Sequence, residues 1–467
     1  MLAWLWACAP APEGAPAPST PPPDRSLAVR VAPSPELPAV ATLSWEGPAG
    51  EATLWTAPDG SDAWEAHAAA TVAEGASALP VALLPVAHVW RWRVTVDADD
   101  GATWESPPGE VYLPPAPDVA LTATIQPGAA FSSGYWVGHQ YAPDVALVLD
   151  AHGSVVWWAP PSTDGGRVLR VRPSLDGRSV LVLEDHPDPA LRRIVRFDLD
   201  GQRRLVTAAP DASHDFQEGD GTFTYVAHLL SDTERMPHAR LPTASDVLRT
   251  VPEGSATGDD AVDGFDFFDD YPYEPWFPCK HAGYDRFVDD ASEWTHTNSL
   301  IRSPRGGWLL VPRYLDAIVQ VTADGAFGWQ AGGRHATLTA EGGPLFRHGH
   351  ASDAWDAPDG LHLLMFDNGS HGPPPVVSRA VELVLSPPPE GDGTMRAVWS
   401  LSDPAQRMTT FLGDAQRLPG GDTLVTWTGS DRRGGVLAEY TPAGDEVWRV
   451  EAQATLGRGR WVPALSP

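Results

Sequence analysis

The chain has 467 residues, and 32 Lys and Arg residues against 61 Asp and Glu residues give it a formal net charge of −29. A balance of that sign argues against nucleic acid as a partner, because affinity for a phosphate backbone comes mainly from Lys and Arg. Hydrophobic residues make up 42% of the chain and charged residues 20%, so it can bury a full core and is not disordered as a whole.

The N-terminus is apolar and then rich in proline. Residues 1–8 are apolar and end at Cys8, and residues 9–26 form a Pro/Ala-rich tether. This order resembles a bacterial lipoprotein signal with residues 5–8 as the lipobox, although the apolar stretch is short and no positive residues precede it, as if the true start lay upstream of Met1. We therefore expect an exported protein of the periplasm, outer membrane or cell surface, with membrane attachment through lipidated Cys8. The alternative is a disordered N-terminus with an incidental cysteine.

Residues 27–113 predict a small β-sandwich. Short runs such as residues 41–45 and 89–96 alternate apolar and polar residues, and Gly, Pro and Asp turns separate them. Alternation with a period of two and closely spaced turns are typical of antiparallel sandwiches. With a Trp on an early strand and a long later strand, the segment resembles a fibronectin type III or immunoglobulin-like module.

From residue 118 to residue 467 the pattern becomes a repeat. One recurring element is a turn followed by a hydrophobic strand. It occurs at residues 176–183, 220–226, 305–311, 359–366 and 420–427. A second element, such as LVLDAHGSVVWW, joins a strand and a turn to a Trp-bearing strand, and it explains much of the content of 20 Trp residues. Units of four strands arranged radially make a β-propeller, so we predict an all-β fold in which a propeller of about six blades follows the sandwich.

A long insertion interrupts the repeat at residues 232–293. It combines several Asp residues with Phe, Tyr and Trp, so it either covers the mouth of the propeller or forms a solvated surface loop. Cys279 lies in it. The chain has only two cysteines, Cys8 and Cys279, which excludes a disulfide framework and a CxxC metal site.

Three histidines stand out as candidates for chemistry. The phosphate-loop, zincin and serine-hydrolase motifs are all missing from the sequence. His214, His296 and His350 each lie shortly before the main strand of a different blade. Because equivalent positions of successive blades converge on a central channel, these side chains are expected to face one another there. The alternative for each is a channel-lining histidine bonded to backbone.

Other polar residues accompany the histidines. Arginine presents a planar fork of donors that matches the oxygens of sulfate or phosphate, and neutral imidazole is a nucleophile or acid–base group near pH 7. We expect Arg313 to act with the three histidines and Arg379 to contact the substrate, unless each arginine pairs with a neighbouring acid. His348 and Asn368 are expected at the substrate as well, although His348 could be merely supporting or solvated and Asn368 could be a turn former.

Five pieces of the sequence, taken in order, resemble the bacterial arylsulfate sulfotransferase family. They are HDF…DGTFTYVAH, EWTHTNSL…LLVPRYLDAIVQV, HGHASDAW…LLMFDNG, SRAVEL and GDAQRLPGGDTLVTW, and the resemblance covers about residues 118–450. It implies a periplasmic or lipid-anchored six-bladed propeller, preceded by a sandwich, that moves a sulfuryl group from a phenolic sulfate ester to a phenolic acceptor without a nucleotide donor. The partners would then be small aryl molecules.

The resemblance also implies roles for individual residues. The family's motifs fall on His214, on His296 with Asn298, and on Arg313. The nucleophilic histidine, which becomes a transient sulfohistidine, falls on His350 in the segment His-Gly-His, with His348 as the competing position. His350 would attack sulfur while Arg313, His296 and His214 hold sulfate oxygens or protonate the leaving phenolate, and Asn298 would help to bind the substrate.

Other functions remain open from the residues alone. A surface-anchored propeller that binds glycans, proteins or aromatic ligands without catalysis would have the same architecture. A quinoprotein dehydrogenase is disfavoured because the blades are too few and adjacent cysteines are missing, and a metal hydrolase lacks paired carboxylate spacing. We therefore expect neither a cofactor nor a metal.

Overall fold

The computed structural model describes residues 25–127, 132–162, 166–231, 243–273, 275, 291–372, 376–388, 391, 393–403, 405, 408–428 and 434–467. Cys8, the tether up to residue 24, Cys279 and much of the predicted insertion lie outside the described residues. The described part of the chain consists of strands, turns and short 3-10 helices, and it contains no helix long and apolar enough to cross a membrane. Two compact units are present: residues up to 32, 42–79 and 88–112 form the first, and residues 33–41, 80–87 and 113–467 form the second.

The segment from residue 30 to residue 113 forms two sheets. One has the order β1 (Arg30–Pro33), β2 (Ala41–Gly47), β5 (Gly75–Val81). The other has the order β4 (Glu65–Val72), β3 (Gly50–Pro58), β6 (His88–Ala98), β7 (Thr103–Glu105), with β8 (Gly109–Leu113) also paired to β6. Buried and exposed side chains alternate along β3, where Ala52 and Leu54 are buried, as the period of two predicts. The resemblance to a fibronectin type III module stays a prediction.

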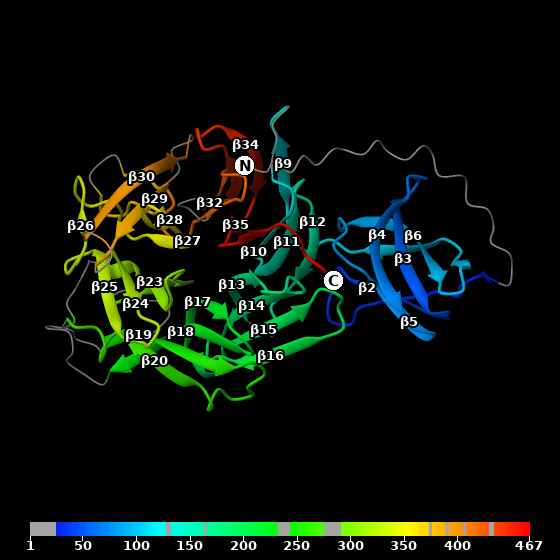
Figure 1. Ribbon diagram of the computed structural model, residues 1–467, viewed down its shortest axis with the longest axis horizontal. Helices are drawn as coiled ribbons and strands as arrows, with labels where there is room; N and C mark the ends of the chain where they lie inside the picture. The colour runs from blue at the N-terminus through cyan, green and yellow to red at the C-terminus, as the bar shows by residue number, and fades with distance from the viewer. Residues whose placement is uncertain are drawn as a thin grey trace. The chain divides into compact units, whose positions relative to one another are not determined.

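Within the described residues, the second unit contains six mainly antiparallel sheets of four or five strands, which follow one another around a common centre (Figure 1). We call them blades 1 to 6. Blade 1 has β10 (Tyr135–Tyr141), β11 (Val145–Asp150), β12 (Val155–Ala159), β35 (Thr455–Leu456) and β36 (Arg460–Val462). Blade 2 has β13 (Arg167–Pro173), β14 (Ser179–Asp185), β15 (Arg193–Asp198) and β16 (Arg204–Ala208). The 3-10 helix η2 (Pro189–Leu191) lies between β14 and β15.

The next two blades carry most of the candidate residues. Blade 3 has β17 (Ala212–Glu218), β18 (Thr222–Ser231), β19 (Thr243–Pro252), β20 (Val262–Asp266) and β21 (Ser292–Glu293), and β21 pairs with β19 in parallel. Blade 4 has β22 (Thr297–Arg302), β23 (Trp308–Pro312), β24 (Ala317–Val321) and β25 (Phe327–Gly332), with the 3-10 helix η3 (Arg313–Leu315) after β23.

The last two blades complete the order. Blade 5 has β26 (Thr339–Ala340), β27 (His350–Ala357), β28 (Gly360–Asp367), β29 (Arg379–Ser386) and β30 (Thr394–Ser402). Blade 6 has β31 (Asp414–Arg417), β32 (Thr423–Thr428), β33 (Gly435–Tyr440), β34 (Glu446–Ala452) and β9 (Leu121–Ile125).

Strands from the two ends of the second unit connect its first and last blades. The C-terminal strands β35 and β36 pair with β10 of blade 1, directly after the chain leaves blade 6. At the other end β9, which precedes blade 1 in the chain, pairs with β34 of blade 6. The pairing of strands far apart in the sequence therefore links blade 6 to blade 1 twice.

Apolar cores fill the space between neighbouring blades. One cluster contains Val156 of blade 1 and Val180 of blade 2, another contains Leu309 of blade 4 and Leu383 of blade 5, and the other interfaces have clusters of the same kind. Blades 2 and 3, for example, meet through Phe216 and neighbouring side chains. Burying this apolar surface holds the blades together and leaves the polar side chains of the first strands toward the centre.

The predicted all-β, β-propeller-like fold is confirmed. Each of the five turn-and-strand segments forms the second strand of a blade, namely β14, β18, β23, β28 and β32. The Trp-bearing strands are the fourth strands β12, β25 and β34, where Trp157, Trp158, Trp329 and Trp448 are buried. The large aromatic side chains thus fill the wide outer part of the interfaces between blades.

Candidate functional site

The predicted histidines lie in or directly before the first strands of three blades, where the backbone is irregular. His214 is in β17, His350 begins β27, and His296 immediately precedes β22. Each of these strands has a shift of register against its neighbour, between Ser213 and Phe216 in β17, between Thr297 and Leu300 in β22, and between Ala351 and Asp353 in β27. Such β-bulges re-aim side chains and are common beside active sites.

Two of the three predicted histidines also have a left-handed backbone. The φ angles are 32° for His214, 54° for His296 and 52° for the neighbouring candidate His348. Positive φ is uncommon for residues other than glycine and costs about 1–3 kcal/mol, so the surrounding structure must hold these residues in place.

The structure brings the predicted histidines to one region. The ring centroids of His214 and His296 are 4.4 Å apart, and Tyr314 lies 4.6 Å from His296 on the other side. His296 and His350 are buried and His214 is partly buried. Burial, followed by the proximity of His296, holds the pKa of His214 well below its ordinary value. Burial also lowers the pKa of His350, with help from the positive charges of Arg458 and Arg313. Both rings are therefore neutral near pH 7.

Hydrogen bonds fix the tautomer of His350. Its Nδ1 lies 2.7 Å from Oδ1 of Asn368. The amide nitrogen of Asn368 donates to the carbonyl oxygens of Thr409 at 2.7 Å and Leu412 at 3.0 Å, which sets the orientation of the amide. Since Oδ1 can only accept, Nδ1 of His350 must carry the proton and Nε2 must carry the lone pair. A neutral imidazole with an available lone pair at Nε2 is a nucleophile.

The other two histidines are also anchored through Nδ1. Nδ1 of His296 lies 2.5 Å from Oε2 of Glu293, which is buried, so it donates to a carboxylate. Nδ1 of His214 contacts the hydroxyl of Ser213. His348 differs, because its backbone N–H donates to Asp316 at 2.6 Å and its ring lies 4.7 Å from that of His371. The ring of His348 also lies 6.1 Å from that of Tyr314.

Arg313 and Asn298 connect blades. The backbone N–H of Arg313 donates to the carbonyl oxygen of His296 at 3.0 Å, and its guanidinium donates to that of Thr410 at 3.0 Å. Asn298 is buried, and its amide donates to the carbonyl oxygen of Gly349 at 3.1 Å, immediately before His350. Asn298 thus ties the backbone of blade 4 to the segment that carries His350.

Arg379 and Asn368 are engaged by protein groups. Nε of Arg379 lies 3.0 Å from a carboxylate oxygen of Asp367, and the guanidinium also donates to the carbonyl oxygen of Leu345 at 2.7 Å. This is the pairing with a neighbouring acid that the sequence left as an alternative. The side-chain amide of Asn368 accepts from His350 and donates to two carbonyl oxygens, so it orients that histidine.

Arg458, which is not among the residues predicted from the sequence, is buried, and its charge adds to burial in lowering the pKa of His350. It donates to the carbonyl oxygen of Asn298 at 2.5 Å and lies 3.5 Å from Asp215 and 3.6 Å from Asp414. Arg170 pairs with the same two carboxylates at 3.3 and 3.2 Å. Arg172 lies closer still to Asp215, at 2.8 Å, so these groups form a buried charge network. Burial alone would raise the pKa of Asp215, but the positive charges of Arg172, Arg458 and Arg170 hold it below its ordinary value.

Glycines flank Arg458 for a steric reason. A Cβ at Gly457 would lie 2.0 Å from Nε2 of His139, and one at Gly459 would lie 2.2 Å from the ring of Trp136. Only glycine lets the C-terminal segment approach blade 1 this closely. The sequence Gly-Arg-Gly-Arg was the one available signal for Arg458, and its meaning depends on the pairing of β35 and β36 with β10.

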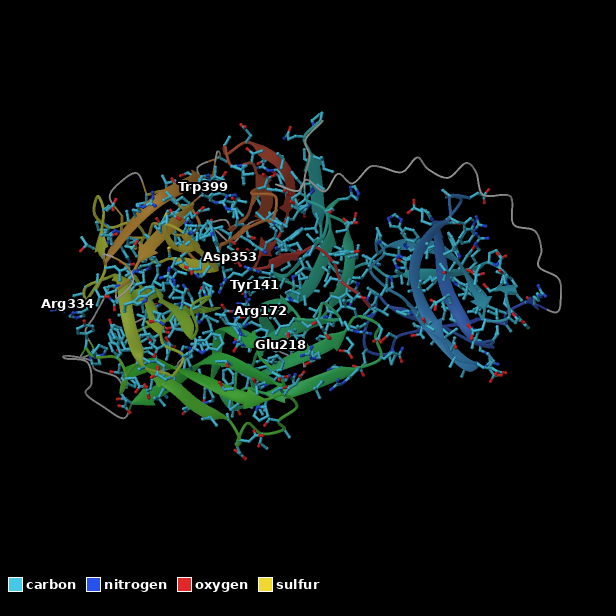
Figure 2. The ribbon with its side chains drawn as sticks, viewed as in Figure 1. Tyr141, Arg172, Glu218, Arg334, Asp353 and Trp399 are labelled. Carbon is cyan, nitrogen blue, oxygen red and sulfur yellow. The ribbon has the colours of Figure 1, made fainter. Side chains whose placement is uncertain are left out.

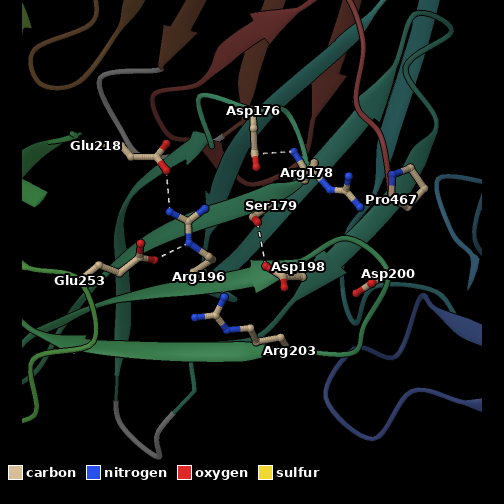
Figure 3. Close-up of a pocket in the computed structure, with 10 residues that line it drawn as sticks. All are labelled: Asp176, Arg178, Ser179, Arg196, Asp198, Asp200, Arg203, Glu218, Glu253 and Pro467. Atoms are coloured by element: carbon tan, nitrogen blue, oxygen red, sulfur yellow. Dashed lines mark hydrogen bonds and ion pairs between the residues drawn. The ribbon is translucent and has the colours of Figure 1, made fainter. Parts of the chain in front are cut away.

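Two cavities in the second unit are lined by residues other than the predicted ones. One, of about 380 Å³, is lined by Arg172, Glu218, Arg302, Asp353 and Arg460 among others. Figure 2 labels Arg172, Glu218 and Asp353 of this set. The other, of about 310 Å³, contains Arg196 between Glu218 and Glu253, with both ion pairs at 2.5 Å (Figure 3). Arg178 and Arg203 also line this cavity, together with Asp176, Asp198 and Asp200.

Comparison with known proteins gives one family. A model of the family described as arylsulfotransferase (ASST) matches residues 135–429, and no curated relative matches. Among solved structures the chain is similar to a protein of unknown function from Bacteroides caccae, with 12% identity over 68% of this chain and 94% of that one and a TM-score of 0.38. It is also similar to a catalytically inactive virginiamycin B lyase from Staphylococcus aureus with quinupristin, with 10% identity over 71% and 99% and a TM-score of 0.32. At these values the two structures carry no argument about function.

Proposed function

The chain belongs to the arylsulfotransferase family, and from this premise we propose that it transfers a sulfuryl group from a phenolic sulfate ester to a phenol through a sulfohistidine at His350. The observation that carries the proposal is the hydrogen bond from Nδ1 of His350 to Asn368, which leaves the lone pair on Nε2. The low pKa of His350 keeps the ring neutral at the pH where it must attack.

The transfer proceeds in two displacements. First, Nε2 of His350 attacks sulfur, the bond from sulfur to the phenolic oxygen breaks, and its electron pair leaves with the phenolate, which takes up a proton. Then an acceptor phenol gives up its proton, its oxygen attacks sulfur, and the N–S bond breaks and returns its electron pair to Nε2. No oxidant, reductant or nucleotide is needed.

The neighbouring groups suit the charges that develop. After burial, the positive charges of Arg458 and Arg313 contribute most to lowering the pKa of His350, and in this proposal Arg313 holds the sulfuryl oxygens. In this proposal His296 and His214 exchange a proton with the phenolic oxygen through Nε2, because Nδ1 is bonded to Glu293 in the first and to Ser213 in the second. Either ring can serve the leaving group in one step and the acceptor in the other.

The test is turnover of 4-nitrophenyl sulfate with and without added phenol. We expect release of 4-nitrophenolate that depends on phenol, and a mass increase of one sulfuryl group on the peptide that contains His350 after quenching without acceptor. His350→Ala should abolish both, whereas the matched control His152→Ala, at an exposed turn of blade 1, should change neither. A folded wild-type protein that shows no turnover with any phenol would instead support the non-catalytic binding module.

We also propose that the protein is exported and anchored through a lipidated Cys8. Support comes from the apolar segment before Cys8 and the Pro/Ala-rich tether after it. Expression with labelled fatty acid, followed by membrane fractionation, should show label and membrane association that Cys8→Ser removes. Equal fractionation of the two proteins would contradict the proposal.

A further inference from the structure

Three side chains with metal-binding groups meet in blade 3, behind His296. They are His228, Asp246 and Glu293. His228 on β18 and Asp246 on β19 are direct partners in the register of the two strands, and Glu293 on β21 stands opposite Ala244 of β19. Side chains two residues apart on a strand share a face, so Asp246 lies on the same face as Ala244. The register therefore brings His228, Asp246 and Glu293 to one face of the sheet. Three adjacent strands thus supply one potential ligand each.

The separations suit a single ion. Nδ1 of His228 lies 3.3 Å from Oδ1 of Asp246 and 4.0 Å from Oε1 of Glu293, and the three potential ligand atoms all lie within 4.8 Å of one another. Tetrahedral zinc with bonds of about 2.0–2.2 Å has ligand atoms about 3.3–3.6 Å apart. The His228–Asp246 separation already has this value, and the ligand atom of Glu293 would have to move closer to the other two. All three residues are buried, with 7%, 2% and 0% of their surface exposed, so rigid neighbours surround the cluster.

Outer hydrogen bonds orient both carboxylates toward the same point. Oδ2 of Asp246 accepts from the hydroxyl of Thr295 and from the backbone N–H of Thr297, both at 2.6 Å, which turns Oδ1 toward His228. Oε2 of Glu293 accepts from His296, which leaves Oε1 as the oxygen nearer His228. Metal-binding carboxylates are typically held in this way by hydrogen bonds to the oxygen that does not bind the ion.

A second group of the same residue types shows what a simple ion-pair cluster looks like. In blade 5, His362 bonds Glu382 through Nδ1 at 2.6 Å and Asp359 through Nε2 at 2.8 Å. The two carboxylates therefore lie at opposite edges of one ring and cannot share an ion with one ring nitrogen. In blade 3, by contrast, both carboxylates approach the same nitrogen of His228.

We propose that His228, Asp246 and Glu293 bind one divalent transition-metal ion, with zinc as the best match to one imidazole and two carboxylates in a nearly tetrahedral site. The ion fastens β21 to β18 and β19. Because Glu293 uses its other oxygen to hold His296, the ion also fixes the position of that histidine. The inference does not depend on the sulfotransferase proposal, since the ligands lie outside the group that would contact the substrate.

The experiment is zinc binding by the full chain. After chelator treatment and its removal, titration with ZnCl₂ in a calorimeter should show about one site per chain, and metal analysis of the untreated protein should show a comparable amount of transition metal. Asp246→Asn and His228→Gln should each weaken binding at least about tenfold. Asp359→Asn, in the blade 5 cluster, is the matched control and should leave zinc binding unchanged.

Thermal unfolding with and without zinc separates loss of the site from loss of the fold. The wild-type protein and the control should gain thermal stability with zinc, whereas the two ligand variants should unfold cooperatively and gain little. The proposal is overturned if the wild-type protein binds no zinc, or if binding is the same in both ligand variants. Neither outcome affects the turnover test of His350.

Discussion

Replacing Asn368 by Asp tests how the protein controls its proposed nucleophile. The substitution keeps an oxygen 2.7 Å from Nδ1 of His350 but makes it a carboxylate. A negative charge at that distance favours the imidazolium, and an opposite charge within about 4–6 Å shifts a pKa by about 1–3 units. In the wild-type protein burial keeps the pKa of His350 well below 6.5. We therefore expect the acid limb of kcat/KM to move up by about 1–3 pH units.

Asn368→Ala is the control, because both substitutions remove the donors to Thr409 and Leu412 but only one adds charge. Loss of the hydrogen bond that fixes His350, worth about 0.5–1.5 kcal/mol, lowers the maximal rate by roughly 2- to 12-fold, and a wrong tautomer lowers it further. The assay is phenol-dependent release of 4-nitrophenolate across pH 4.5–9 at each variant's own KM. If the Asp and Ala variants share one pH profile, Asn368 does not govern the protonation of the nucleophile and the reasoning fails.

Three further substitutions or truncations test the centre of the propeller. Arg458→Leu removes one of three arginines around the buried carboxylate of Asp215 and the donor to the carbonyl oxygen of Asn298, so denaturant unfolding should show a loss of about 1–3 kcal/mol. Gly457→Ala places a Cβ 2.0 Å from His139, and its unfolding free energy should fall by about 1–3 kcal/mol, while unchanged stability would show that the ring can move aside. Removal of β35 and β36 takes the C-terminal strands from blade 1, so hydrogen exchange should rise first in β10 rather than evenly across the blades.

Local patterns were enough to predict most of the blades. A turn with Gly followed by a run of apolar residues marks β14 or β28 because both faces of a second strand are buried between neighbouring blades. The Trp-bearing strands were equally visible, since buried Trp157 and Trp448 occupy the same outer position in their blades. These features depend on residues close together in the chain, so they can be predicted from the sequence alone.

Contacts between distant residues were beyond the same reasoning. Arg458 meets Asn298, which lies 160 positions earlier, only because the C-terminal strands return to blade 1. The choice between His348 and His350 has the same origin. Both are in one short motif, but only His350 begins β27 opposite Phe366 and so reaches Asn368 just beyond β28. The pattern of the motif offers no reason to prefer one ring.

The irregular backbone at the histidines is the least predictable feature and the one most closely tied to function. Left-handed φ at His214, His296 and His348 costs about 1–3 kcal/mol each, a sum comparable to the whole stability of an ordinary domain, about 5–15 kcal/mol. The backbone preferences of histidine alone would disfavour a positive φ at these positions. They persist because the apolar interfaces between blades hold each first strand on both sides, so the strand can bulge without separating from its neighbours. The same packing that stabilises the propeller therefore permits the strained segments that turn imidazoles of different blades toward one another.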